Sequence, residues 1–275
     1  MRRAISTQLA GWAVPLLSEA AALARSVLIA RALGAEELGR IMVLALALRL
    51  AEMLADVGIE RFLMARPGVI GPDLLAALHG AALWRGAVTA LFLLALALPA
   101  AVLLSGAAEI ATHAALAVVP LIRAFVHLDY RLQERERQLF PLVVVEGGAV
   151  VAMLGAVPLA LTLAGDHRAI VAILGVQALA QVALSQLVAR TTWRAANDRT
   201  VLAEIMGFGG PLILNAALMF VTFQADRLVV AGFNPAWSDR ECEHARDLTE
   251  PALLLAGYDT RGVSLMERAD ALMPQ

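Results

Sequence analysis

The chain has 275 residues, of which 60% are apolar and only 17% are charged, and its mean hydropathy is +0.73. Soluble domains carry roughly 45–50% apolar and about 25% charged residues, so this composition excludes a disordered chain and indicates a membrane protein. The single cysteine excludes an internal disulfide framework, and the net charge of −2 excludes a nucleic-acid binder held by bulk charge. We therefore expect an all-α, multi-pass bundle of transmembrane helices.

Seven stretches are long and apolar enough to cross a bilayer, which takes about 20 residues each. Glycine, proline and charged residues separate them. Gly34 is expected to end the first helix and Gly165 the fifth, while the charged run 131–137 lies outside the hydrocarbon. The expected spans are 7–31, 36–58, 74–104, 108–130, 139–164, 169–190 and 205–232.

Arginine, the only basic residue type besides histidine, is unevenly distributed between the connecting segments. If the N-terminus lies inside the cell, the inner segments hold ten arginines and the outer segments hold three. Because basic residues concentrate on the cytoplasmic side of membrane proteins, we expect a cytoplasmic N-terminus. A cleaved signal peptide is disfavoured because Glu19 interrupts the first apolar stretch.

The chain divides into three parts by composition. Residues 1–200 are expected to form a six-helix transporter lobe, and residues 201–233 a seventh membrane helix that begins a second lobe. Residues 234–275 hold eight acidic residues and four arginines, with no apolar run long enough to span a bilayer. We expect this last part to be an acidic, poorly ordered tail.

Four arginines lie well inside four different expected spans: Arg25, Arg49, Arg85 and Arg123. Ionisable groups inside a membrane span are costly and usually face a bundle interior or a wet cavity. A guanidinium group binds phosphate with two parallel hydrogen bonds, so a cavity lined by these arginines is suited to an anion. Pairing with nearby acids stays open as the alternative, with Arg49 and Glu52 as one such pair. Whether the four arginines converge on one cavity also stays open.

Several short motifs follow one another in a fixed order along the chain. They are the run Ala30-Arg31-Ala32-Leu33-Gly34, then Glu37, Gly39, Asp56 and Gly58, and later Phe208-Gly209, Pro211 and Asp226-Arg227. Together with the seven spans, this order resembles bacterial oligosaccharide flippases of the multidrug/oligosaccharidyl-lipid/polysaccharide exporter superfamily. The resemblance covers about residues 1–232, which is the amino-terminal lobe and about one further helix.

The resemblance implies a flippase that moves undecaprenyl-diphosphate-linked oligosaccharides across the bacterial inner membrane, for lipopolysaccharide or exopolysaccharide synthesis, without a cofactor. Its partners are then the lipid-linked oligosaccharide and the lipid bilayer. The candidates for a cavity that binds the diphosphate are Arg25, Arg49, Arg85 and Arg123. The resemblance also implies coupling to an ion gradient, for which the candidates are Glu19, Glu52 and Asp56.

The chain departs from this family in length. Family members usually continue through a second lobe of six or more helices, and a single lobe cannot rock against a partner that it lacks. We therefore expect that the chain alone does not transport. Three origins stay open: a truncated or frameshifted gene product, a half-transporter that forms a homodimer, and a split gene whose second chain supplies the other lobe.

Three other functions stay open. One is a non-transporting membrane subunit of a polysaccharide assembly complex, and another is a drug exporter of the same superfamily, which the arginines within the spans disfavour. The third is a polyprenyl-phosphate-dependent glycosyltransferase that uses Glu36 and Glu37, although acids in the first turn of a helix also suit its macrodipole. The five histidines lie far apart without metal-ligand spacing, so we expect no metal site and no enzyme.

Overall fold

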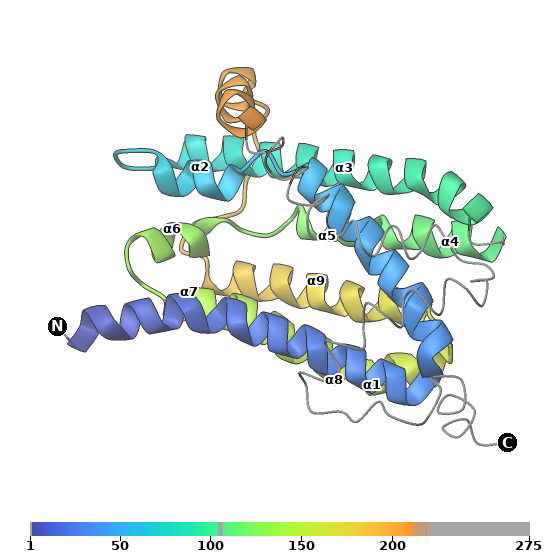
Figure 1. The fold of residues 1–275 in the computed structure, drawn as a ribbon. Coiled ribbons are helices and arrows are strands. Elements are labelled where there is room, and N and C mark those ends of the chain that lie inside the picture. The colour runs from blue at the N-terminus through green and yellow to red at the C-terminus, as the bar shows by residue number, and fades with distance from the viewer. Residues whose placement is uncertain (1, 104–106, 212, 214, 216–217, 219–275) are drawn as a thin grey trace, which may run out of the picture. The chain divides into compact units, whose positions relative to one another are not determined.

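The computed structural model describes residues 2–103, 107–211, 213, 215 and 218, and the regular structure of these residues is entirely helical (Figure 1). The chain divides into two units, 1–224 and 225–275, and all described residues belong to the first unit. The all-helical prediction is therefore confirmed for the described residues. The expected tail and most of the expected seventh span lie outside them.

Three helical segments of the described residues are long and apolar enough to cross a membrane. They are Pro72–Ala97, Phe140–Ala164 and Ala169–Val188, and Ile110–Arg123 is a shorter apolar helical segment. The three long segments coincide with the expected spans 74–104, 139–164 and 169–190, and the shorter one lies within the expected span 108–130. The full count of seven spans and the cytoplasmic N-terminus stay predictions.

Helix α1 (Arg2–Leu54) folds back on itself at Gly34, where φ is 86° and ψ is 178° (Figure 1). This backbone conformation is essentially restricted to glycine, because a Cβ atom would clash with the neighbouring peptide groups. The two expected spans 7–31 and 36–58 thus correspond to the two halves of α1. The predicted end of the first helix at Gly34 is confirmed.

Replacing Gly34 with alanine is expected to lower the free energy of unfolding by about 1–3 kcal/mol. A Cβ atom at Gly34 would meet nothing within 4 Å, so the cost comes from the backbone conformation alone. Gly39 also has open space around it but lies in regular helix, so G39A is the matched control and should be neutral or slightly stabilising. Thermal unfolding in detergent measures both, and equal stability of the two variants would contradict the bend.

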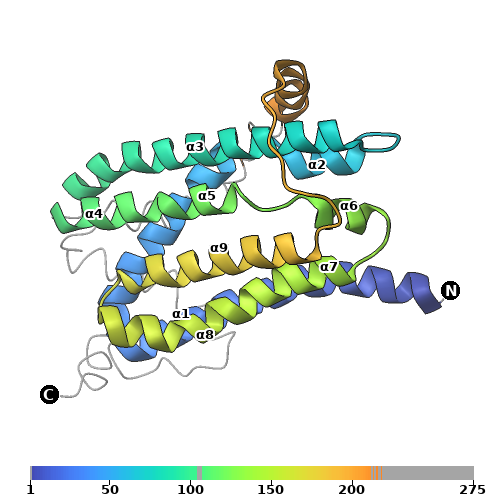
Figure 2. The same ribbon diagram turned by 180° about the vertical axis from the view of Figure 1, so that it is seen from behind.

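The helices form two layers that are visible from both sides of the molecule (Figures 1 and 2). One layer contains α3 (Pro72–Leu103), α4 (Ala107–Leu116) and α5 (Val118–Arg123). The other contains α8 (Gly148–Ala164), α9 (Ala169–Val188) and the first half of α1. The second half of α1 runs obliquely from the second layer to the first (Figure 1).

The two layers share one apolar core. Leu44 and Leu48 of α1 belong to the same buried cluster as Leu93 of α3 and Ile170 and Ile173 of α9, and each is at most 5% exposed. These residues lie on helix faces that turn toward the other layer, as helical periodicity requires. The core fixes the spacing of the layers on both sides of α1.

The expected span 108–130 is interrupted, which corrects the prediction. Helix α5 ends at Arg123, and residues 124–128 are not helical before α6 (Asp129–Arg135) begins. Side chains replace the helical carbonyl acceptors here: Ser185 Oγ accepts from the His127 amide at 2.9 Å, and His79 Nε2 accepts from the Leu128 amide at 3.1 Å. Because these acceptors satisfy the backbone, the chain can leave the helix without a buried unpaired amide.

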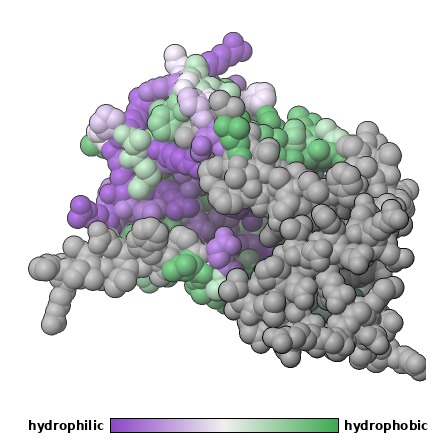
Figure 3. Space-filling model, viewed as in Figure 1, coloured by the Kyte–Doolittle hydropathy of each residue, from purple (hydrophilic) through white to green (hydrophobic). Residues whose placement is uncertain are grey.

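The segments that the arginine count assigns to the cytoplasm gather at one end of the helices. This end carries the start of α1, the short helix α2 (Ile59–Ala65), α6 and residues 189–198, while the bend at Gly34 and the turn at Gly165 lie at the other end (Figures 1 and 2). Figure 3 shows hydrophilic residues concentrated on the side of α2 and α6 and apolar residues over α3. Successive long helices therefore run in opposite directions, as expected when each connecting segment lies at the opposite end from the one before it.

Residues 199–211 form a further helix at the end that carries α2 and α6, and they are the described part of the expected seventh span. Ile205 is fully buried in the cluster of Phe62 and Leu63 on α2. The Phe208 and Phe62 rings meet edge to face, with 5.8 Å between their centroids. Aromatic and aliphatic contacts thus attach this helix to α2.

Candidate functional site

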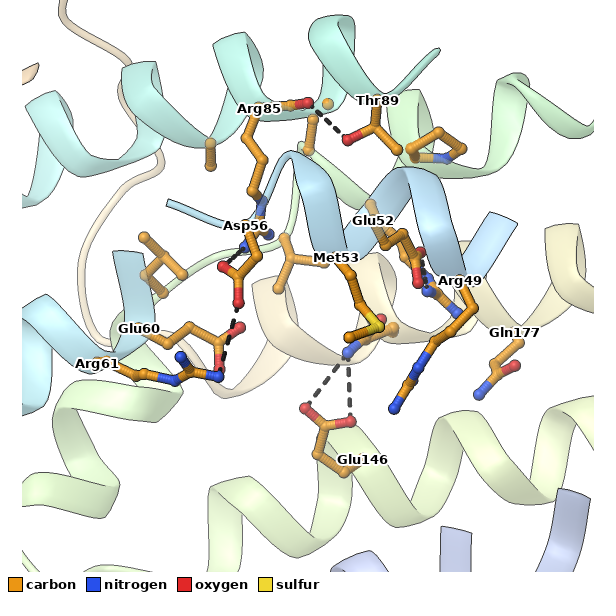
Figure 4. A pocket seen from close by; sticks show the side chains of 18 of the residues that line it. Arg49, Glu52, Met53, Asp56, Glu60, Arg61, Arg85, Thr89, Glu146 and Gln177 are labelled. Atoms are coloured by element: carbon orange, nitrogen blue, oxygen red, sulfur yellow. Dashed lines mark hydrogen bonds and ion pairs between the residues drawn. The ribbon is translucent and has the colours of Figure 1, made fainter. Parts of the chain in front are cut away.

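A cavity of about 530 Å³ lies between the two layers and is shown in Figure 4. Its lining comes from α1, α2, α3, α5, α6 and α9, from the turn that precedes α8, from residues 124–128, from Asp56 between α1 and α2, and from Asn215. Uncharged polar groups are contributed by Thr89, Gln177, Gln181 and Asn215. The charged lining residues are Arg49, Glu52, Asp56, Glu60, Arg61, Arg85, Arg123 and Glu146.

Three of the four arginines selected from the sequence line this cavity: Arg49, Arg85 and Arg123. Glu52 and Asp56, selected as ion-coupling candidates, line it too. Arg49, Glu52 and Asp56 follow one another at i, i+3 and i+7, so the helical repeat of α1 and its final turn bring them to one side. The structure thus gathers five of the seven candidates, and their roles stay predictions.

The remaining two candidates lie on the first half of α1, outside the cavity lining. Arg25 Nη1 contacts Met153 Sδ of α8 at 3.3 Å, and Glu19 is exposed. The first half of α1 packs beside α8 (Figure 2), and neither Arg25 nor Glu19 belongs to the lining of the cavity. Convergence of all four arginines on one cavity is therefore not observed.

Most arginines of the cavity are paired with carboxylates. Arg123 Nη1 lies 2.6 Å from Glu52 Oε1. Arg85 and Arg61 lie 3.7 and 3.8 Å from the two carboxylate oxygens of Asp56. The pair that the sequence suggested between Arg49 and Glu52 is not formed, because Arg123 from the neighbouring layer occupies the Glu52 carboxylate.

Arg49 differs from the other cavity arginines. Within the described part of the chain, no carboxylate lies within ion-pair distance of its guanidinium group. Figure 4 shows the side chain extending into the cavity, away from Glu52. Arg61, Arg85 and Arg123 each face a carboxylate of the lining, so Arg49 is the cavity arginine that an anionic ligand can reach without displacing an ion pair of the described residues.

Sequence reasoning did not select Glu146, which lies on the π-helical turn η1 (Val143–Gly147) between α7 (Phe140–Leu142) and α8. Its Oε1 atom accepts hydrogen bonds from Tyr130 Oη at 2.9 Å and from Arg131 Nη2 at 3.2 Å. Gln181 Nε2 lies 3.3 Å from both carboxylate oxygens. The one signal in the sequence was a single charge within the otherwise apolar segment 140–164.

Arg131 of α6 holds three carboxylates at once. Its guanidinium nitrogens lie 3.0 Å from Glu60, 3.0 Å from Glu134 and 3.2 Å from Glu146. Burial by itself lowers the pKa of Arg131, but Tyr130 and the facing carboxylates outweigh burial and raise this pKa above its ordinary value. Arg131 therefore stays charged and ties α2, α6 and η1 together.

Glu36 and Glu37, the candidate residues of the glycosyltransferase alternative, lie just beyond the Gly34 bend. Glu37 Oε2 accepts from the His167 amide at 2.8 Å and lies 2.9 Å from His167 Nδ1, while its other oxygen lies 3.3 Å from Arg40. These contacts attach the bend of α1 to the turn between α8 and α9. Glu37 therefore takes part in contacts that hold these two segments together.

A sequence model described as polysaccharide biosynthesis protein matches residues 28–235, which are 208 of the 275 residues. No curated protein matches the chain significantly, and no solved structure does. The matched range contains every residue of the cavity lining, from Arg49 to Asn215. With its apolar membrane-length helices, the chain belongs to the polysaccharide biosynthesis protein family and is a membrane protein related to polysaccharide synthesis.

Proposed function

We propose that this protein binds an undecaprenyl-diphosphate-linked oligosaccharide in the cavity and takes part in moving it across the bacterial inner membrane, as a flippase. The observation that carries the proposal is Arg49, a cation without a carboxylate partner among the described residues, inside a polar cavity between apolar helices. A diphosphate is the anionic group of the lipid-linked intermediates used in polysaccharide synthesis. The guanidinium fork matches two of its oxygens.

The rest of the cavity suits the sugar part of such a ligand. Gln177 and Gln181 follow each other at i and i+4 on α9, and both line the cavity together with Thr89. Carboxamide and hydroxyl groups can both donate hydrogen bonds to sugar hydroxyl groups and accept hydrogen bonds from them. The volume of about 530 Å³ lies within the range of roughly 300–1,000 Å³ for small-molecule sites, which suits a headgroup rather than a polyprenyl chain.

The pairing of charges disfavours a drug exporter that takes organic cations. Glu52 and Asp56 are engaged by arginines of the cavity, and Glu60 and Glu146 are engaged by Arg131. An organic cation would have to displace an arginine from one of these carboxylates, whereas an anion can bind Arg49 directly. The ion pairs thus support an anionic substrate.

Transport by alternating access requires two lobes that move against each other. We therefore propose that ligand binding is a property of this chain and that movement of the ligand requires a second lobe. In this proposal the protein acts as a transporter and not as an enzyme.

Binding is tested with the full chain in lipid nanodiscs and with two lipids, undecaprenyl diphosphate and undecaprenol, by native mass spectrometry. Retention of the diphosphate lipid and not of the alcohol supports the anion site, and equal retention contradicts it. Proteoliposomes with a fluorescent lipid-linked oligosaccharide then measure flipping. Flipping by the monomeric chain contradicts the need for a second lobe, and binding without flipping in any assembly favours a non-transporting subunit.

A further inference from the structure

Glu146 is the single ionisable residue of the segment Phe140–Ala164, which is long and apolar enough to cross a membrane. A charge in such a segment is costly, and it usually faces a polar cavity where it has a function. Glu146 lines the cavity, and its side chain is 21% exposed, so water in the cavity reaches the carboxylate.

The backbone around Glu146 departs from a regular α-helix, and this departure directs the side chain toward the cavity. Residues 143–147 form a π-helical turn, whereas the residues on both sides are α-helical. Such turns are rare and are frequent at functional sites, because they rotate the side chains of one turn relative to the rest of the helix. Figure 4 shows the Glu146 carboxylate pointing into the cavity. Gln181 Nε2 lies 3.3 Å from each of its oxygens.

The two oxygens of Glu146 have different surroundings. Oε1 accepts hydrogen bonds from Tyr130 and Arg131 of α6 and from Gln181 of α9. Among the described residues, Oε2 has only the Gln181 amide, at 3.3 Å. No further charged group among the described residues forms an ion pair with Glu146. Oε2 is therefore the position at which the carboxylate can accept a proton.

Arg131, the positive charge that faces Glu146, is shared with two other carboxylates. Arg131 also binds Glu60 and Glu134, so one positive charge faces three negative charges. Arg131 Nε is buried and has no acceptor among the described residues, which is a cost of the present arrangement. Neutralising one carboxylate would reduce the negative charge and leave Arg131 with its other two partners.

We propose that Glu146 is a proton-binding site of the cavity and that its protonation releases Arg131 from η1 and loosens α6 from the membrane helix. A hydronium ion in the cavity transfers its proton to Oε2 and leaves water, so the carboxylate becomes a neutral acid. The net charge of Arg131 with its three carboxylates changes from −2 to −1. Use of this proton to drive transport rests on the proposed function, but proton binding itself does not.

Infrared difference spectroscopy of the full chain in nanodiscs tests the site, by comparison of spectra recorded at alkaline and at acidic pH. Other carboxyl groups of the chain also protonate in acid, so the spectra of E146Q are subtracted from those of the wild type. We expect this double difference to contain a protonated-carboxyl band that grows as the pH falls. E52Q is the matched control, because Glu52 is another cavity carboxylate paired with an arginine, and this variant should keep the band. E146D should keep the band at a shifted frequency, which separates loss of the carboxyl group from misfolding.

Absence of this band from the double difference, or its disappearance in E52Q, overturns the assignment to Glu146. A spectrum that responds to sodium at constant pH and not to protons also overturns it, in favour of a cation site. The release of α6 is measured by hydrogen exchange at a single pH, where the amides of residues 129–135 should exchange faster in E146Q than in wild type or E52Q. Neither measurement depends on the diphosphate lipid, so failure here is distinct from failure of the proposed function.

Discussion

Replacing Arg49 with alanine is expected to weaken binding of undecaprenyl diphosphate by about 10- to 100-fold, or about 1.4–2.8 kcal/mol. Arg49 is the cavity arginine with no carboxylate partner among the described residues, so its guanidinium group is available to the diphosphate. For the same reason, its removal breaks no ion pair, and the thermal stability of R49A should equal that of the wild type. Native mass spectrometry in nanodiscs measures the binding.

The control for this variant is R31A, since Arg31 is exposed and lies outside the cavity lining. R31A should bind the diphosphate lipid as the wild type does. R123A is expected to behave differently, because it leaves the Glu52 carboxylate without its partner at 2.6 Å and should reduce stability as well as binding. Unchanged binding by R49A, or an equal loss in R31A, would place the anion elsewhere.

Replacing Gly80 with alanine is expected to lower the free energy of unfolding by about 1–3 kcal/mol, the usual cost of overfilling a packed site. A Cβ atom at Gly80 would lie 2.0 Å from the carbonyl oxygen of Ala196, which is backbone and cannot rotate away. The Ala196 amide donates to the Ala76 carbonyl at 2.8 Å, and this bond would have to break or stretch. Thermal unfolding in detergent measures the loss.

G155A provides the contrast for this prediction. Gly155 lies within α8, and a Cβ atom there would meet nothing within 4 Å, so the variant should be as stable as the wild type or slightly more stable. The difference between G80A and G155A reports the packing of residues 189–198 on α3. Equal stability of the two variants would show that this packing is absent.

The packing of residues 189–198 also explains the break after α5. His79 lies next to Gly80, and its Nδ1 atom is 2.9 Å from the Arg194 carbonyl while its Nε2 atom accepts from the Leu128 amide. One side chain of α3 thereby joins two connecting segments at the same end of the helices. Neither contact can be read from the sequence, because Leu128 and Arg194 lie 49 and 115 residues from His79.

The sequence by itself determined the features that depend on local properties. Apolar stretches predicted α3, the segment 140–164 and α9, since hydropathy alone decides which residues can lie in a bilayer. Gly34 predicted the end of the first helix, which is where the structure has the bend of α1, because glycine is a helix stop signal. The ordered motifs also led to the polysaccharide family, which the match over residues 28–235 then showed.

Only the tertiary structure decided how the polar residues within those helices combine. Glu52 pairs with Arg123, 71 positions away, and not with Arg49, and the hydrogen bonds of Glu146 come from α6 and α9. Helical periodicity gives the face on which a side chain lies, but the partner across that face depends on which helices pack together. The unpaired charge at Arg49 is therefore a property of the folded lobe, because it arises from the distances between residues on different helices.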